Sequence, residues 1–394
     1  MKRKQPSRWL LAGALLLSQM TACKTDSADK PKANLDDEYE WAEPAFDPVM
    51  VDSYEMDGAT FEIYEVPGLA CVRQQSDIEG LPGNAVQPGS VASFVVAVPN
   101  GVVDPEAVFY LPPGDSVETL ESFAVLTWNN DPSDAFLAMF ELQVALGVDW
   151  EMTTSEYSRA ESEQWATGNT AALALERGWP VVVPGNCWGD TGQGTGDRII
   201  HGTYSAPRYG ALLENGVLDN VFERWPESRR LAWGCSNGGA RIAARLIEDP
   251  TRFDAVVLDA PADNYAAYSD EPATFVVEQL NDVMGAEFVQ ETIDNYLEAF
   301  NGGRTGAEAY SLGLTLGDGI DLDHLPIYLG WTPEDENLGP AVVEPLVDAL
   351  SDPQRYSNPL SEVHEFPVRD HCAITTDETR RAEAMDWLES AADR

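Results

Sequence analysis

Residues 230–248 read RLAWGCSNGGARIAARLIE and contain the strongest single indication of the fold. The short apolar run at 230–233 is typical of a buried strand, and Gly238–Glu248 has the apolar spacing of a helix. Between them, Gly234-Cys235-Ser236-Asn237-Gly238 fits the pattern G-x-S-x-G, a sharp turn from strand to helix that leaves the serine hydroxyl exposed. Ser236 is therefore a candidate nucleophile. The alternative is a glycine-rich turn that only packs a helix close to a strand.

Short apolar runs and helical segments alternate along the rest of the chain. The runs predicted as strands are 93–98, 107–111, 123–128, 180–183, 230–233, 255–258, 326–329 and 363–366, and the predicted helices include 133–146, 170–177 and 238–248. This alternation predicts an α/β fold with a mostly parallel central sheet and helices on both faces. The runs 93–98 and 107–111, joined across Asn100-Gly101, are expected to begin the sheet as an antiparallel pair. The long connection at about 264–325 predicts a helical lid insertion over the carboxyl edge of the sheet.

The charge balance excludes one large class of function. The chain has 394 residues with 24 Lys+Arg against 67 Asp+Glu, which gives a formal net charge of −43. Binding to nucleic acid needs an excess of cations to neutralise phosphates, so no nucleic-acid partner is expected. Beyond residue 33, Arg is the only permanent cation. Such a surface stays strongly hydrated at the cost of self-repulsion, which salt screens.

The N-terminus indicates export. Positive residues at Lys2–Arg8 precede an apolar run at Trp9–Met20 that is too short to span a bilayer, so residues 1–22 are predicted to be a signal peptide. The stretch Met20-Thr21-Ala22-Cys23 resembles a bacterial lipobox, which implies lipidation of Cys23 and a cell-envelope lipoprotein that meets the membrane only through this anchor. Plain cleavage and secretion is the alternative. Residues 23–45 are expected to form an acidic tether, and 46–394 the folded domain.

A nucleophilic serine needs a base, and the chain has four histidines. His371 lies just beyond the last predicted strand, which is the place of the base in the order serine, acid, histidine of α/β-hydrolases. His364 lies inside that strand, and His201 and His324 are weaker candidates. His371 is therefore predicted to take the proton from the serine.

The acid of such a triad should follow the strand at 326–329. The loop there offers Glu334, Asp335 and Glu336, and its similarity to the acid loop of α/β-hydrolases favours Asp335, with Glu334 as the alternative. The backbone N–H of Asn237 is the expected first oxyanion donor. An N–H of Asn129, after the strand at 123–128, is the expected second, with Asn130 as the alternative.

The candidate serine and histidine suggest how the five cysteines pair. Cys235 directly precedes the proposed nucleophile and Cys372 directly follows the proposed base, so the two must lie close together if the serine and the histidine meet. In an oxidising compartment we expect a disulfide between them, which the loop-entropy estimate values at on the order of 4–5 kcal/mol. With Cys23 lipidated, the remaining pair is Cys71–Cys187.

The combination of Cys235-Ser236, Asp335 and His371-Cys372 resembles the CS-D-HC arrangement of the tannase and feruloyl esterase family. The stretch at 253–264 is also similar to that family's strand ending in A-P-A-x-N. Members are secreted serine α/β-hydrolases that cleave gallate or hydroxycinnamate esters. The resemblance implies an exported serine carboxylesterase that forms an acyl-enzyme on a small-molecule or oligomeric ester.

Neither a cofactor nor a metal is expected, because the acidic run at 318–323 lacks the spacing of a calcium loop. Three other functions remain open. The stretches at 236–239 and 192–196 also resemble hydroxybutyrate-oligomer hydrolases, a serine peptidase can share this fold, and a surface-binding lipoprotein could keep the fold without activity.

Overall fold

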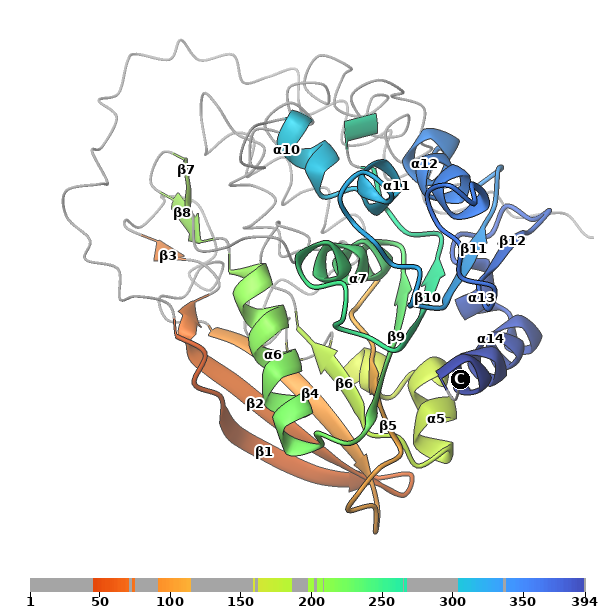
Figure 1. The fold of residues 1–394 in the computed structure, drawn as a ribbon. Helices are drawn as coiled ribbons and strands as arrows, with labels where there is room; N and C mark the ends of the chain where they lie inside the picture. The colour runs from red at the N-terminus through yellow and green to blue at the C-terminus, as the bar shows by residue number, and fades with distance from the viewer. Residues whose placement is uncertain are drawn as a thin grey trace, which may run out of the picture.

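The fold is described from a computed structural model (Figure 1). It describes residues 45–70, 73–74, 91–114, 159, 162–185, 198–201, 204–207, 209–264, 266–267, 304–335 and 338–392. The predicted strand at 123–128, the predicted helix at 133–146, residues 1–44 and most of the expected lid lie outside these residues. Among the helices that are described, none is both long and apolar enough to cross a membrane.

A nine-stranded sheet forms the centre of the described part of the molecule. Its spatial order is β1 (Val49–Met56), β2 (Ala59–Ala70), β4 (Val91–Pro99), β6 (Val181–Pro184), β5 (Ala107–Tyr110), β9 (Arg229–Cys235), β10 (Ala255–Asp259), β11 (Ile327–Trp331) and β12 (Glu362–Glu365). The six strands from β6 to β12 run parallel, whereas β1, β2 and β4 pair antiparallel. The predicted α/β-hydrolase fold with a mostly parallel sheet is confirmed. A small second sheet contains β3 (Arg73–Gln74), β8 (Tyr204–Pro207) and β7 (Arg198–His201).

The expected antiparallel pairing of 93–98 with 107–111 is wrong. Strand β5 lies between β6 and β9 and is parallel to both, while β4 pairs with β2 and β6. The connection from Pro99 to Ala107 is too long for a two-residue hairpin and carries the chain past the neighbouring position. That position is filled by β6, which comes later in the sequence, so β5 becomes a central strand.

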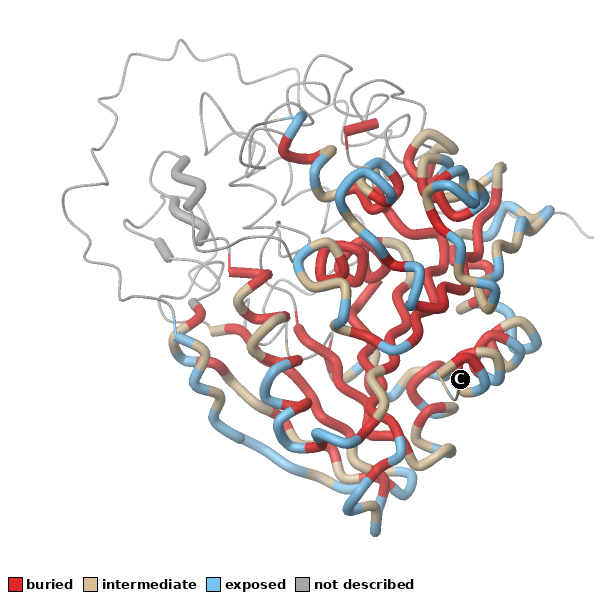
Figure 2. Tube along the Cα trace, viewed as in Figure 1, coloured by how far each residue is buried: buried red, intermediate tan, exposed pale blue. Residues whose placement is uncertain are grey.

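Helices cover both faces of the sheet because the strand residues alternate between two apolar clusters. On one face, α6 (Gly210–Arg224), α7 (Asn237–Glu248) and α12 (Pro340–Ser351) pack on residues such as Ala232, Val256 and Leu258. On the other, α5 (Asn169–Glu176) and α14 (Glu378–Ala392) pack on residues such as Trp233 and Val257. The central strands are buried along their length (Figure 2). The first helical face holds α7, which follows the predicted nucleophile.

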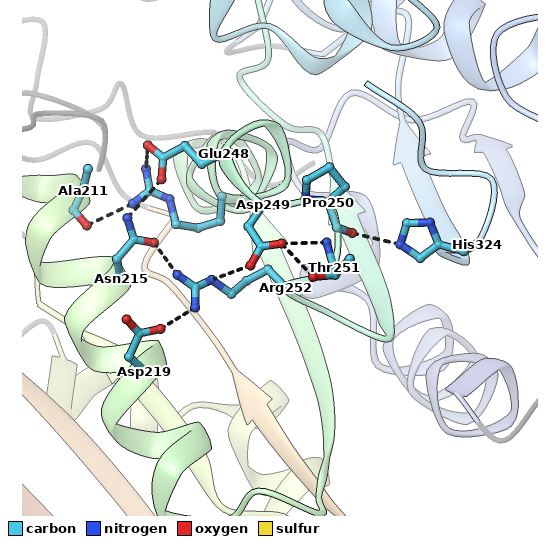
Figure 3. Close-up of polar contacts among 10 residues, drawn as sticks. Ala211, Asn215, Asp219, Glu248, Asp249, Pro250, Thr251, Arg252 and His324 are labelled. Carbon is cyan, nitrogen blue, oxygen red and sulfur yellow. Dashed lines mark hydrogen bonds and ion pairs between the residues drawn. The ribbon is translucent and has the colours of Figure 1, made fainter. Parts of the chain in front are cut away.

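Polar contacts fix α7 against α6 (Figure 3). The guanidinium of Arg245 donates to the carbonyl oxygen of Ala211 over 3.2 Å, and Arg252 donates to the side chain of Asn215 over 2.8 Å. Nearer the start of α7, Arg241 forms a fully buried ion pair with Glu214. The helix that follows the predicted nucleophile and the turn after it are therefore joined to α6 at several points.

Strand β1 is an edge of the large sheet. Its first three residues, Val49, Met50 and Val51, are about half exposed, at 49%, 55% and 44%. Figure 2 shows β1 as a mostly exposed stretch at the edge of the sheet. Its outward backbone groups have no partner strand among the described residues.

Candidate active site

Ser236 lies at the turn between β9 and α7 in an unusual backbone conformation. Its φ is 52° and its ψ is −120°, a strained combination for a residue with a side chain that costs on the order of 1–3 kcal/mol. Two backbone hydrogen bonds hold it there. The N–H of Ser236 donates to the carbonyl oxygen of Asp259 over 2.9 Å, and the N–H of Ala262 donates to the carbonyl oxygen of Ser236 over 3.0 Å. Ser236 as a whole residue is only partly buried.

The glycines around Ser236 are required by close approaches of the backbone. A Cβ on Gly234 would collide with the backbone of Gly238, and a Cβ on Gly238 would collide with the carbonyl oxygen of Pro112. The pattern G-x-S-x-G therefore records how tightly the strand, the turn and the helix are packed.

His371 and Asp335 are brought together from two loops. The ring Nδ1 of His371 lies 2.8 Å from Oδ2 of Asp335, and their side chains are 16% and 3% exposed. An ionised carboxylate can only accept, so Nδ1–H donates and Nε2 is left as the basic atom. The other oxygen of Asp335 accepts the N–H of Leu338 over 3.0 Å, which fixes the carboxylate. This is the arrangement of an acid that orients a catalytic imidazole.

Glu334, the alternative acid, lies in different surroundings. It is exposed, and its carboxylate is 3.2 Å from the guanidinium of Arg369, which is exposed too. An exposed ion pair of this kind contributes little to stability. The residue next to it, Asp335, is the one that contacts His371.

A disulfide joins the loop of the histidine to the turn of the serine. Cys235 and Cys372 are bonded, with their Cα atoms 5.7 Å apart. A ring nitrogen of His371 and the two sulfur atoms all lie within 4.8 Å of one another. His371 therefore lies beside the turn that carries Ser236. Within the described ranges these three residues are the one cluster with metal-ligating atoms this close, and both sulfurs are already used by their mutual bond.

The other histidines lie elsewhere. Nε2 of His324 is 3.0 Å from the carbonyl oxygen of Pro250, beyond the C-terminal end of α7 (Figure 3). Nε2 of His364 is 2.7 Å from the carboxylate of Glu362 on the same strand. His201 ends β7 in the small sheet.

Asn237, the expected first oxyanion donor, lies at the start of the helix that follows Ser236. Asn237 is the first residue of α7 and is 2% exposed, so its N–H lies at the positive end of the helix dipole. Asn129 lies outside the described residues, as do Cys23, Cys71 and Cys187.

The structure adds a turn to this region that sequence reasoning did not single out. Strand β5 lies directly beside β9, and its continuation at 111–114 reaches the elbow. A Cβ on Gly114 would lie 2.7 Å from the carbonyl oxygen of Cys235 and 3.0 Å from its sulfur. The signal for this turn in the sequence is Pro112-Pro113-Gly114, directly after an apolar run.

A second carboxylate lies beneath the site. Asp259 ends β10 and is fully buried, and this burial raises the pKa of its carboxyl group to about 6. Hydrogen bonds from Thr375 and Ile374 and the nearby His371 oppose that rise. The sequence marked it only as a polar residue after the apolar run AVVL.

The chain was compared with family models, curated proteins and solved structures, and only solved structures gave matches. No protein-family model and no curated protein matches the sequence. Among solved structures, an S-formylglutathione hydrolase from Agrobacterium tumefaciens aligns with a TM-score of 0.46 and 14% identity over 88% of this chain and 99% of its own. An acetyl xylan esterase from Paenibacillus sp. R4 aligns with a TM-score of 0.45 and 15% identity over 99% and 96%. A fluorophosphonate-binding serine hydrolase from Staphylococcus aureus aligns with a TM-score of 0.46 and 14% identity over 84% and 98%. The fold assignment itself rests on the strand order of this chain.

Proposed function

We propose that this protein is a serine carboxylesterase with Ser236 as nucleophile, His371 as base and Asp335 as the acid that orients the base. The observation that carries the proposal is the hydrogen bond between His371 and Asp335, beside a serine held in a strained strand-to-helix turn. The disulfide between Cys235 and Cys372 supports it, because it keeps the two loops together.

The chemistry follows from these positions. Oγ of Ser236 attacks the ester carbonyl carbon while Nε2 of His371 takes its proton. The N–H of Asn237 stabilises the oxyanion of the tetrahedral intermediate. Collapse expels the alcohol, which receives the proton from His371 and leaves an acyl-serine. Water, deprotonated by the same imidazole, then attacks the acyl carbon. The bond to Oγ of Ser236 breaks, Oγ takes the proton back from His371, and the acid is released. Asp335 stabilises the imidazolium in both halves of the cycle.

The substrate class is proposed to be small or oligomeric carboxylic esters, with galloyl and feruloyl esters as the leading candidates. The support is the paired motif of Cys235-Ser236 and His371-Cys372 together with Asp335. Galloyl, feruloyl, hydroxybutyryl and peptide substrates, compared by kcat/KM, test this part of the proposal.

The test of the activity uses p-nitrophenyl acetate and p-nitrophenyl butyrate. We expect wild type to hydrolyse them and Ser236→Ala to lose at least about a thousand-fold in kcat. Ser390→Ala, which removes an exposed serine hydroxyl on α14, is the matched control and is expected to keep wild-type rates. Hydrolysis that Ser236→Ala leaves unchanged would refute the proposal.

Export with a lipid anchor at Cys23 is part of the proposal, and so is the tether that follows it. A disulfide beside the site is typical of proteins that fold outside the reducing cytoplasm. The intact mass of the detergent-extracted protein should show a chain that begins at Cys23 and carries lipid, and Cys23→Ser should lack the added mass.

A further inference from the structure

Asp259 connects the two loops that carry the proposed serine and histidine. Its backbone carbonyl oxygen accepts the N–H of Ser236 over 2.9 Å. Its carboxylate accepts the N–H of Ile374 over 3.2 Å and the N–H of Thr375 over 2.6 Å. These two amides belong to α13 (Ala373–Thr376), the single helical turn directly after His371-Cys372. One residue therefore contacts both sides of the site.

Burial at this position makes ionisation of the Asp259 carboxyl group unfavourable. Asp259 is 0% exposed at the end of a strand whose other residues are apolar, and burial raises the pKa of its carboxyl group to about 6. Backbone amides are the main groups that offset this cost. An apolar side chain at this point would leave the amides of Ile374 and Thr375 without this acceptor, which is costly for buried groups.

Several residues with strained backbone conformations lie close to Asp259. Among the described residues, four that are not glycine have a positive φ, and three of them surround Asp259: Ser236 at 52°, Ala260 at 45° and Cys372 at 54°. Such conformations persist only where neighbouring contacts over-determine them. The hydrogen bonds of Asp259 supply such contacts for Ser236 and for the turn after Cys372.

The turn α13 is also held from its other side. Arg381 donates to the carbonyl oxygen of Thr375 over 2.6 Å, and Arg380 donates to that of Ala373 over 3.3 Å. The indole N–H of Trp233 donates to the hydroxyl of Thr375 over 3.1 Å. Asp259 supplies the acceptor for the amides and the arginines supply donors for the carbonyls, so the turn is clamped between opposite charges.

We propose that Asp259 is a positioning residue for the proposed hydrolysis: its carboxylate anchors α13 and thereby sets the place of the His371 imidazole relative to Ser236. The proposal rests on the proposed function. Asp259 itself does not touch the substrate. Two other titratable groups lie in its field, His371 and the phenol of Tyr328 on β11.

The test compares Asp259→Asn with Asp263→Asn. Asp263 is a matched control because it too is 1% exposed or less and carries a carboxyl group whose pKa burial raises to about 6. Its carboxylate instead accepts from Ser311, Leu312 and Gly313, at 2.6, 2.8 and 3.0 Å. Each change keeps the side-chain size and replaces one acceptor oxygen by a donor.

We expect Asp259→Asn to lower kcat for p-nitrophenyl acetate about 100-fold with KM within twofold, because a displacement of about 1 Å in a reacting group has that effect. Asp263→Asn should keep kcat within about threefold while losing comparable stability. Equal losses of kcat in the two variants would overturn the proposal, as would wild-type kcat in Asp259→Asn.

Amide hydrogen exchange tests whether Asp259 anchors α13 without any measurement of enzyme activity. In wild type, the amides of Ile374 and Thr375 should exchange as slowly as those of β10, and Asp259→Asn should speed them at least tenfold while Asp263→Asn does not. Fast exchange at these two amides in wild type refutes the anchor even if Asp259→Asn fails to fold. Slow exchange in a wild type that hydrolyses no ester would instead refute the esterase and leave the anchor standing.

Discussion

Asp335 and Glu334 are adjacent carboxylates with opposite surroundings. Asp335 is 3% exposed and bonded to His371, whereas Glu334 is 72% exposed and faces Arg369. The carboxylate of Asp335 can fix the tautomer of the imidazole, whereas the carboxylate of Glu334 is mainly surrounded by water. The sequence left open which of these two residues is the acid of the triad, and substitutions at each can now decide it.

Asp335→Asn is expected to lower kcat by about 10³–10⁴-fold with little change in KM, because an amide no longer orients and stabilises the imidazolium. Glu334→Gln removes the same charge one residue away and should stay within about twofold of wild type. Initial rates with p-nitrophenyl butyrate measure both. The reverse ranking of the two variants would show that Glu334 is the acid.

At this scale the sequence was informative where neighbours in the chain are neighbours in space. The prediction that Cys235 pairs with Cys372 followed from their adjacency to Ser236 and His371. The positioning role proposed for Asp259 could not be predicted, because it depends on backbone amides that lie 115 and 116 positions further along the chain. An isolated Asp after an apolar run gives no hint of which backbone groups it will meet.

At the scale of elements, the disulfide joins β9 to the start of α13 across 137 positions of the chain. The double change Cys235→Ala and Cys372→Ala should lower the free energy of unfolding by about 2–5 kcal/mol, since a long loop is no longer closed in the unfolded chain. Urea denaturation with and without reductant measures it. If reductant destabilised the double variant as much as wild type, the loss would come from another source.

Helix α11 (Leu312–Thr315) is tied to the loop after β10 by the buried carboxylate of Asp263. Burial raises the pKa of this group from 3.8 to about 6, so the folded state binds its proton more tightly than the unfolded state. Its contribution to the free energy of unfolding is fully present below about pH 4 and is lost as the pH rises through 6, on the order of 3 kcal/mol. Asp259 contributes with the same sign.

We therefore expect the free energy of unfolding to fall between pH 4.5 and 7, as measured by urea denaturation at several pH values. Asp263→Asn should reduce that slope, because it removes one of the two groups. Asp318→Asn, which removes a charge from an exposed position, is the control and should keep the slope of wild type. An unchanged slope in Asp263→Asn would contradict the assignment.

The elements themselves were predicted well where the hydrophobic run was continuous, as for β9, β10 and α7. The error at β5 had a physical cause. Runs that follow each other in sequence were assumed to pair, but β6 occupies the place between β4 and β5. Long-range order of strands depends on packing across the whole sheet, which local periodicity does not contain.

At the scale of the whole molecule, the net charge of −43 is expected to lower the stability of the compact state through self-repulsion. We expect the melting temperature to rise by several degrees between about 0.01 and 0.3 M NaCl, because the screening length falls from about 30 Å to below 10 Å. Sodium sulfate at equal ionic strength should match NaCl in this range if screening is the cause. A melting temperature that stays flat would mean that the acidic groups are too far apart to repel strongly.

The exposed edge at β1 gives this charge a second consequence. No strand among the described residues pairs with its outer side. Its half-exposed Val49, Met50 and Val51 and its outward backbone groups therefore offer a second copy an edge on which to add a strand. We expect mutual repulsion between copies to keep such edges apart in dilute buffer. Salt shortens the range of the repulsion between copies, and by the same screening it stabilises the folded state of each copy. Colloidal stability and conformational stability of this protein should therefore respond to ionic strength in opposite directions.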